Sequence, residues 1–246
     1  MKSILGVVIY LFFISGFAQT SSMSYQVTYK IESKFDMNTL KDERQVFIDI
    51  MSKSMDYAKR MKFELITNKK ISYFSEKKRV QFEDPLILDV LSSTVKSFTR
   101  FNEVTYADFK TDSLIFIRNL MSVDRTIKTG LHDFNWEIKS ETKTILGFEA
   151  RKATGTYYDL IWDSTTDVEA WFIPAIPLRS GPDIYMGLPG LIVEVRLPKV
   201  VVTASLIEEK ESLIIEKPDE ATAMSQEEYE DYVSSSKKQL ESLNRN

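Results

Sequence analysis

Apolar and polar residues alternate over many short stretches of this chain. Residues 24–32, SYQVTYKIE, put both tyrosines, Val27 and Ile31 on one face, which is the period-two pattern of a half-buried β-strand. The same kind of pattern predicts further strands at 60–66, 71–75, 113–118, 134–139, 143–148, 168–173, 191–197, 200–207 and 212–216. So many short strands with few helical stretches favour a mainly β (α+β) fold, built as a single large antiparallel sheet or half-barrel.

Two segments have helical features instead. Residues 225–243 begin with a capping-box pair, Ser225 and Glu228, and then place Tyr229 and Val233 on one face, which predicts a C-terminal helix. Residues 84–98, DPLILDVLSSTVKSF, open with a capping acid followed by a proline suited to the first helical position. A buried strand followed by a loop fits this second segment equally well.

Glycine and proline crowd into residues 181–190, GPDIYMGLPG. Residues 188–191, Leu-Pro-Gly-Leu, have proline second and glycine third, which predicts a type II turn with positive φ at Gly190. Gly181 and Gly187 would permit close approach of neighbouring backbone. We expect a rigid corner that leads into the strand 191–197. The motif comprises Gly181, Pro182, Gly187, Leu188, Pro189, Gly190, Leu191 and Ile192.

The N-terminus has the pattern of a secretory signal peptide. Lys2 precedes an apolar run over 4–14, and small residues stand at Gly16 and Ala18, which predicts cleavage after Ala18. No later stretch reaches the roughly 20 apolar residues of a spanning helix, so we expect no transmembrane segment. These features predict a periplasmic or secreted protein with a signal peptide at 1–18, a β-rich domain at 19–220, and a helix and tail at 221–246.

The amino-acid composition excludes several classes of ligand and partner. The chain has no cysteine, so neither disulfides nor thiolate metal ligands are available. Its formal net charge is −4 and no basic stripe occurs, which argues against nucleic acid as a partner. We expect no cofactor and no metal, and an apolar ligand or an envelope protein as the partner.

Candidate catalytic groups are few. His132 is the only histidine, no Gly-x-Ser-x-Gly motif accompanies it, and we interpret it as a loop residue. Residues 159–169, DLIWDSTTDVE, carry four acids that could bind calcium or act as acid and base. Their spacing does not match a calcium loop, so a solvated hairpin with its turn over 163–167 is favoured. Asp163 and Glu169 are the candidates if the protein is a cofactor-free hydrolase.

Three tryptophans are predicted on strands around this hairpin: Trp136, Trp162 and Trp171. Large aromatic side chains most often fill a core. On the concave face of a curved sheet they could instead line an apolar ligand groove. We therefore take them as the candidate ligand-binding residues.

The second half of the chain resembles the GLPGLI family of exported Bacteroidota proteins. The similarity is carried by 176–195, IPLRSGPDIYMGLPGLIVEV, by AWF at 170–172, and by 136–154, WEIKSETKTILGFEARKAT. Many family members have a cysteine where this chain has Ala150, so no thiol chemistry can operate here. The family has no assigned reaction, and its strand pattern is similar to half-barrel lipoprotein carriers at the level of fold only.

These observations favour an exported protein that acts by binding. Two alternatives stay open, a carboxylate-dependent hydrolase and a structural envelope component without a ligand. A binding protein needs an apolar cavity, whereas the hydrolase needs two buried carboxylates that face one cavity.

Overall fold

The computed structural model describes residues 23–77, 85–120, 123–161, 163–211 and 213–243. Its elements are, in order, β1 (Met23–Ser33), the 3-10 helix η1 (Met37–Leu40), α1 (Gln45–Ala58), β2 (Lys62–Thr67), β3 (Ile71–Glu76), α2 (Pro85–Thr99), β4 (Val104–Asp108), β5 (Ser113–Leu120), β6 (Val123–Gly130), β7 (Glu137–Ile145), β8 (Phe148–Asp159), β9 (Ser164–Ile173), β10 (Leu191–Leu197), β11 (Val200–Glu211) and α3 (Gln226–Leu243).

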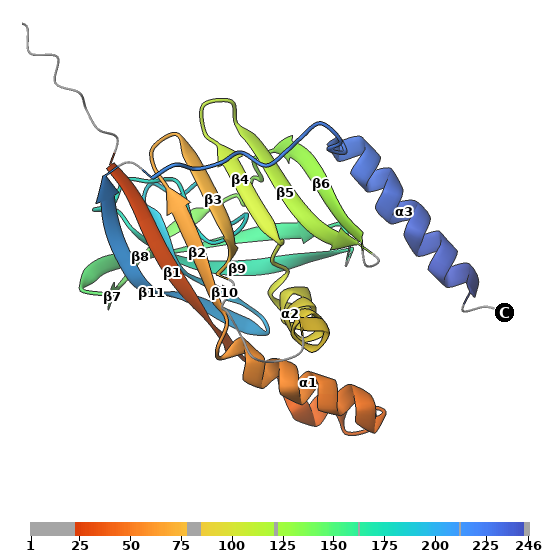
Figure 1. The fold of residues 1–246 in the computed structure, drawn as a ribbon. Coiled ribbons are helices and arrows are strands. Elements are labelled where there is room, and N and C mark those ends of the chain that lie inside the picture. The colour runs from red at the N-terminus through yellow and green to blue at the C-terminus, as the bar shows by residue number, and fades with distance from the viewer. Residues whose placement is uncertain (1–22, 78–84, 121–122, 162, 212, 244–246) are drawn as a thin grey trace, which may run out of the picture.

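The strands form one antiparallel sheet in the order β6-β5-β4-β3-β2-β1-β11-β10-β9-β8-β7. This order is two meanders, β1 to β6 and β7 to β11, that meet where the first strand pairs with the last. Figure 1 shows α1 and α2 at one end of the first meander and α3 beyond its edge strand β6. The mainly β prediction with a single large sheet and a C-terminal helix is confirmed.

The sheet is strongly curved, and its connectivity requires this. Residues 131–136 link β6 to β7, which are the two edge strands. Those few residues span at most roughly 24 Å, whereas the edges of a flat eleven-stranded sheet would lie about 48 Å apart. Irregular register in β1, β7 and β10 adds local bends.

The concave face is filled by protein. Residues 174–190, between β9 and β10, pack there, and Ile176, Leu178, Ile184 and Tyr185 of this segment are all buried. Aromatic rings of β2, β3 and the α2–β4 connection surround it, with Phe63 stacked on Phe74 at 5.4 Å between ring centroids. The core of the protein therefore occupies the space that a half-barrel carrier would leave for a ligand.

Most of the predicted strands are present, with three differences. The predicted strand 143–148 spans the β7–β8 hairpin turn, where Leu146 and Gly147 have positive φ. The predicted strand 212–216 is wrong over its described residues, because 213–216 do not pair with the sheet. Strands β4 and β6 were not predicted, and of β8 only Phe148 falls within a predicted strand. Only Ile127 is buried in β6, so its sequence lacks an alternating apolar face.

The helices follow their capping signals. Residues 85–99 are helical, so of the two interpretations of this segment the helix is correct. In α3 the capping box forms, since the Ser225 amide donates to Glu228 at 2.7 Å and the Glu228 amide donates to the Ser225 hydroxyl at 3.2 Å. Helix α1 was not predicted. No side chain caps it, and its buried face includes Ser54. No helix of the described residues is long and apolar enough to cross a membrane.

Candidate functional site

The glycine-proline motif builds the core rather than a type II turn. The predicted positive φ at Gly190 is wrong, because in this motif the positive φ among glycines belongs to Gly187, at 101°. The Leu191 amide donates to the Ile176 carbonyl at 2.9 Å instead of closing a turn. Gly190 is required by space, since a Cβ there would lie 2.8 Å from the carbonyl carbon of Ile173.

Trp136 anchors this segment from the other side. It lies in the connection before β7, and its indole N–H donates to the Met186 carbonyl at 2.9 Å. Its ring stacks on Phe134 with centroids 4.9 Å apart. Gly187 approaches the indole closely, with its ideal Cβ position 3.8 Å from Nε1. Trp136 therefore holds the buried motif in place on the concave side.

Trp171 points to the opposite, convex face. It pairs across the sheet with Lys152, its indole donates to Glu169 at 2.9 Å, and the Lys143 ammonium lies 4.1 Å from its ring centroid. Ion pairs of Glu169 and Glu194 surround it and leave it only 8% exposed. Trp162 lies outside the described residues. The two tryptophans that are described thus do not share a groove.

The acids of the β8–β9 hairpin are also dispersed. Asp163 is an exposed turn residue with positive φ, and Tyr158 donates to it at 2.5 Å. Glu169 lies six residues further along extended chain, roughly 20 Å away, and is paired with Lys152 and Arg196. The two candidate hydrolase carboxylates do not face one cavity. No group of three or more possible metal-binding side chains occurs among the described residues.

His132 lies in the loop before β7, as expected, and it is half-buried. Its ring meets Tyr157 edge to face, with centroids 5.4 Å apart. Burial lowers the pKa of His132 to about 4, and the nearby positive charge of Arg118 adds to the effect. The imidazole is therefore neutral at physiological pH.

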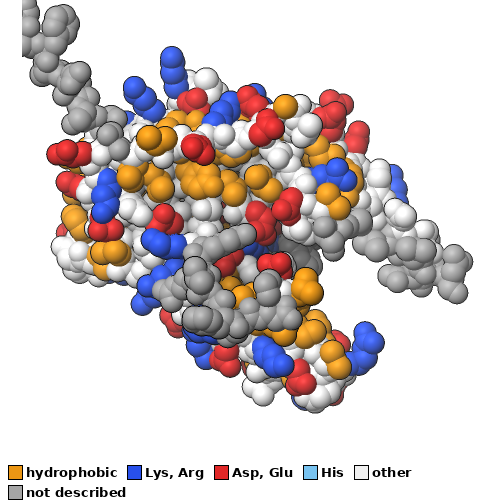
Figure 2. Space-filling view, in the orientation of Figure 1, with side chains coloured by type: hydrophobic (Ala, Val, Ile, Leu, Met, Phe, Trp, Pro, Cys, Tyr) orange, Lys and Arg blue, Asp and Glu red, His pale blue; other side chains and the backbone are white. Residues whose placement is uncertain are grey.

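An apolar groove lies on the convex face of the first meander. Its floor is made by Ile66, Tyr73, Val104 and Ile117, one from each of β2 to β5. Cross-strand register places them on one face, because Ile66 pairs with Tyr73 and Val104 pairs with Ile117. All four are half-buried. In Figure 2 hydrophobic side chains gather in a band over this part of the sheet.

The groove is covered by residues 213–224, which we call the strap. It crosses the convex face from the end of β11 to the start of α3 (Figure 1). The strap and the floor border an open groove with a volume of about 490 Å³. This volume is within the range of small-molecule sites. We refer to the four floor residues and their cover as the convex groove.

The strap is fixed at its ends. At one end the Met224 amide donates to the Thr126 carbonyl and the Met224 carbonyl accepts from the Lys128 amide, both at 2.9 Å. At the other end the Leu213 amide donates to the Ser24 hydroxyl at 3.5 Å. Within the described chain, no backbone hydrogen bond joins 214–219 to the sheet. The middle of the strap can therefore move without breaking backbone hydrogen bonds of the sheet.

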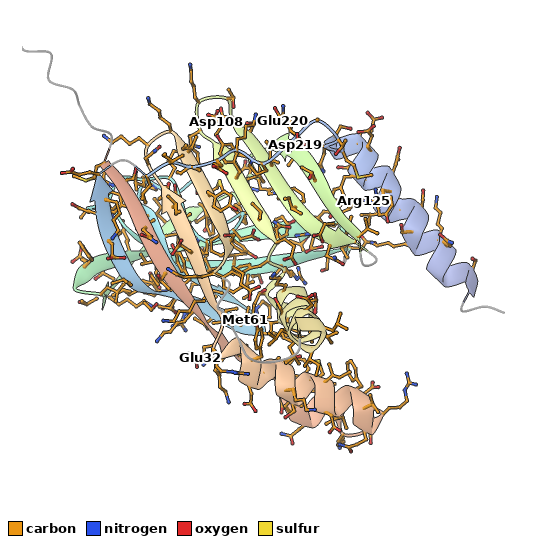
Figure 3. All side chains as sticks on the ribbon, viewed as in Figure 1. Glu32, Met61, Asp108, Arg125, Asp219 and Glu220 are labelled. Atoms are coloured by element: carbon orange, nitrogen blue, oxygen red, sulfur yellow. The ribbon has the colours of Figure 1, made fainter. Side chains whose placement is uncertain are left out.

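Charge is confined to one wall of the convex groove. The floor has no charged side chain, whereas the strap contributes Glu216, Lys217 and Asp219. Glu220 accepts ion pairs from Lys217 at 2.7 Å and from Lys128 at 3.0 Å, which fixes the strap's polar side. Figure 3 shows Asp219 and Glu220 on the strap near the end of β4 that carries Asp108. A ligand here would meet an apolar floor and a mixed cover, because Ile214, Ile215 and Pro218 of the strap also line the groove.

Sequence reasoning missed the convex groove because its floor residues come from four strands, one of which, β4, was not predicted. One signal was available. The apolar residues 213–215 are followed directly by a charged stretch that contains a proline. The alternating pattern of the chain offers no strand with which these residues would pair.

Comparisons with known proteins support the class of fold. The structure, an open and curved antiparallel sheet, is similar to two crystal structures of PNGF-II, in space groups C2 and P21. For each, the TM-score is 0.50 and the identity 16%, over 86% of this chain and 33% of the PNGF-II chain. The present chain thus spans about a third of the PNGF-II chain, and the likeness concerns the fold alone.

In sequence, a family model described as "Protein of unknown function (Porph_ging)" matches residues 159–194. The matched segment runs from the end of β8 through the buried motif into β10. No curated protein matches the sequence.

Proposed function

We propose that this is a non-catalytic binding protein that holds a small molecule in the convex groove. The molecule is either apolar throughout or has an apolar body with one polar end. The supporting observation is the open groove of about 490 Å³ between four half-buried apolar side chains and the strap. The ligand body would cover Ile66, Tyr73, Val104 and Ile117, and its polar end would face the strap. The concave face, where we first expected the ligand, is occupied by residues 174–190.

The polar end of the ligand is not expected to be anionic. Acids outnumber bases on the strap wall, and Lys217 is already paired with Glu220. An anionic head group would therefore gain little attraction there. Contact of the floor with apolar ligand surface supplies about 25 cal/mol per Å² removed from water.

The test uses Nile red, an uncharged apolar dye, with monoolein as competitor. Ile117→Lys places a charge on the groove floor and should weaken dye binding by about tenfold or more. Ile138→Lys is the matched control, because Ile138 is an apolar residue on β7 that is already 42% exposed. Equal dye affinity for Ile117→Lys, Ile138→Lys and the unaltered protein would contradict the proposal.

We also propose that the chain is an exported protein of the GLPGLI group. The support is the motif at 187–192 together with the signal-like pattern at 1–18, which lies outside the described residues. N-terminal sequencing of protein from its native host should begin at Gln19. An intact Met1 on the mature protein would contradict export.

A further inference from the structure

A second cavity, separate from the convex groove, lies where the end of α2 meets β9 and the β10–β11 turn. It measures about 180 Å³. Its lining residues are Ser97, Phe98, Arg100, Thr166, Leu197, Pro198 and Lys199. Two of these are cationic, two carry hydroxyl groups and none is acidic. A cavity lining with two cationic residues and no acid is notable in a chain whose formal net charge is −4.

Arg100 is held there in a strained conformation. It directly follows α2, and its φ is 59°. Helices usually place glycine or asparagine at this left-handed position, because a larger side chain is strained there. The Arg118 guanidinium donates to the Arg100 carbonyl at 3.4 Å, which helps to fix the backbone. Strain of this kind persists where the surroundings impose it, and such residues cluster at binding sites.

The guanidinium of Arg100 has unused hydrogen-bonding capacity. Its Nη1 donates to the Thr166 hydroxyl at 2.6 Å and lies 3.9 Å from an oxygen of buried Asp159. Among the described residues, no partner binds its Nε or Nη2. A guanidinium offers five N–H donors in a plane, in a geometry that suits carboxylate and phosphate oxygens.

The neighbouring groups add to this capacity. The Thr166 hydroxyl accepts from Arg100, so its own proton is free to be donated. Lys199 forms no ion pair within the described residues, and its ammonium lies 5.5 Å from the ring centroid of Phe35. The Ser97 hydroxyl is already donated to the Thr94 carbonyl at 2.8 Å. Three residues that carry hydrogen-bond donors therefore line the cavity: Arg100, Thr166 and Lys199.

Asp159 is the carboxylate nearest to this group, and it does not line the cavity. It lies on the other side of Arg100, in a neighbouring cavity of about 240 Å³ that also contains Arg118 and Lys96. Lys96 is neutralised by Glu76 and Glu103. The cavity lined by Arg100 and Lys199 therefore has a net positive charge.

We propose that this cavity binds the oxyanion group, phosphate or carboxylate, of a small molecule. Arg100 and Thr166 would hold the anion from the inner wall, and Lys199 would close on it from the rim. The apolar surfaces of Phe98, Leu197 and Pro198 would contact the body that carries the anion. The site does not depend on the convex groove, so either proposal can fail without the other.

The test measures binding of inorganic phosphate and of acetate by isothermal titration calorimetry at low ionic strength, with chloride as the ionic-strength control. We expect saturable binding with a Kd of about 1 mM or tighter. Lys199→Gln should weaken it several-fold without changing the melting temperature, because Lys199 is exposed. Arg100→Gln should weaken it by about tenfold or more. Arg151→Gln, which removes an exposed guanidinium on β8, is the matched control.

Binding of phosphate alone, or of acetate alone, would support the site and identify its anion. Arg100→Gly separates binding from folding, because glycine relieves the strain at this position while it removes the guanidinium. A folded Arg100→Gly protein that binds the anions as tightly as the unaltered protein would overturn the proposal. So would unchanged affinity in Lys199→Gln, or a response to chloride equal to that to phosphate and acetate.

Discussion

At the scale of single residues, the glycines of this chain serve two different physical needs. Gly147 has a φ of 83° in a hairpin turn, and nothing lies within 4 Å of a Cβ added there. Gly190 has no positive φ, but its Cβ would meet the backbone of Ile173 and the ring of Phe172. The first glycine is needed for conformation and the second for space.

Alanine substitution should separate these needs. Gly147→Ala is expected to cost about 1 kcal/mol of unfolding free energy, the strain of a left-handed residue. Gly190→Ala should cost more, about 3 kcal/mol, because the backbone of Ile173 cannot rotate away as a side chain could. Urea unfolding followed by tryptophan fluorescence measures both. A smaller loss for Gly190→Ala than for Gly147→Ala would contradict the packing argument.

His132 should make the protein sensitive to acid. Its pKa is lowered from 6.5 to about 4 in the fold by burial and by Arg118, with Asp159 acting in the opposite direction. Between these values the unfolded chain binds more protons than the native protein, so the unfolding free energy falls as pH falls from 6.5 towards 4. At about 1.4 kcal/mol per pKa unit, the loss is at most about 3 kcal/mol.

Replacement of the imidazole tests this directly. His132→Gln should remove this part of the decline, so that its unfolding free energy approaches or exceeds that of the unaltered protein at low pH. Urea unfolding at several pH values between 4 and 7 gives the two curves. Parallel curves over the whole range would show that the imidazole does not titrate as described.

At the scale of elements, the apolar pattern of the sequence predicted the strands that bury most of their residues. The strand at 191–197 was predicted with its observed bounds, because every residue in it except Arg196 is buried. Edge strand β6 buries one residue, and α1 exposes Val46 and Phe47 in its first turn, so neither showed the expected periodicity.

The site was less predictable than the fold. The convex groove depends on register across four strands, and register comes from long-range pairing that no local pattern contains. Arg100 gave no signal either, because its left-handed backbone follows from how α2 ends against β9. The tryptophans were conspicuous in the sequence, yet Trp136 and Trp171 serve packing on opposite faces.

The strap gives a prediction at this scale. Met224→Pro removes the amide that donates to Thr126, so the anchored end should loosen. We expect hydrogen exchange of the Lys128 amide, which donates to the Met224 carbonyl, to increase by about tenfold or more. Glu216→Pro is the control, because no backbone hydrogen bond of 214–219 to the sheet is lost there. Equal Lys128 protection in both variants would mean that the strap is held elsewhere.

At the scale of the whole molecule, the two meanders are joined by more than the β1–β11 ladder. The Tyr29 hydroxyl donates to the Ile192 carbonyl at 2.6 Å, and Thr67 and Ser180 share a hydrogen bond of 2.5 Å. Asn102 donates to Asp183 at 3.0 Å. These buried bonds connect the first meander to the motif that fills the concave face. The chain should therefore unfold as one cooperative unit despite its repeating topology.

Two probes can test this cooperativity. The three tryptophans all lie between residues 136 and 171 of the sequence, after the last strand of the first meander, and a bimane attached at Lys69→Cys would report on the exposed β2–β3 turn of that meander. The chain has no other cysteine, so labelling is confined to that site. We expect both signals to change at the same urea concentration.

Tyr29→Phe then tests the connection itself. It leaves the buried Ile192 carbonyl without this donor and should cost about 1–2 kcal/mol of unfolding free energy. Because the bond joins β1 to the start of β10, both probes should shift to the same lower urea midpoint. Phe63→Leu is a comparison at a core residue of β2 whose ring contacts, Phe74 and Phe101, both lie before β4, and in a cooperative protein it too should shift both signals together. If the tryptophan midpoint moves while the bimane midpoint stays, the meanders unfold separately, and the sheet is two domains joined at the β1–β11 pair.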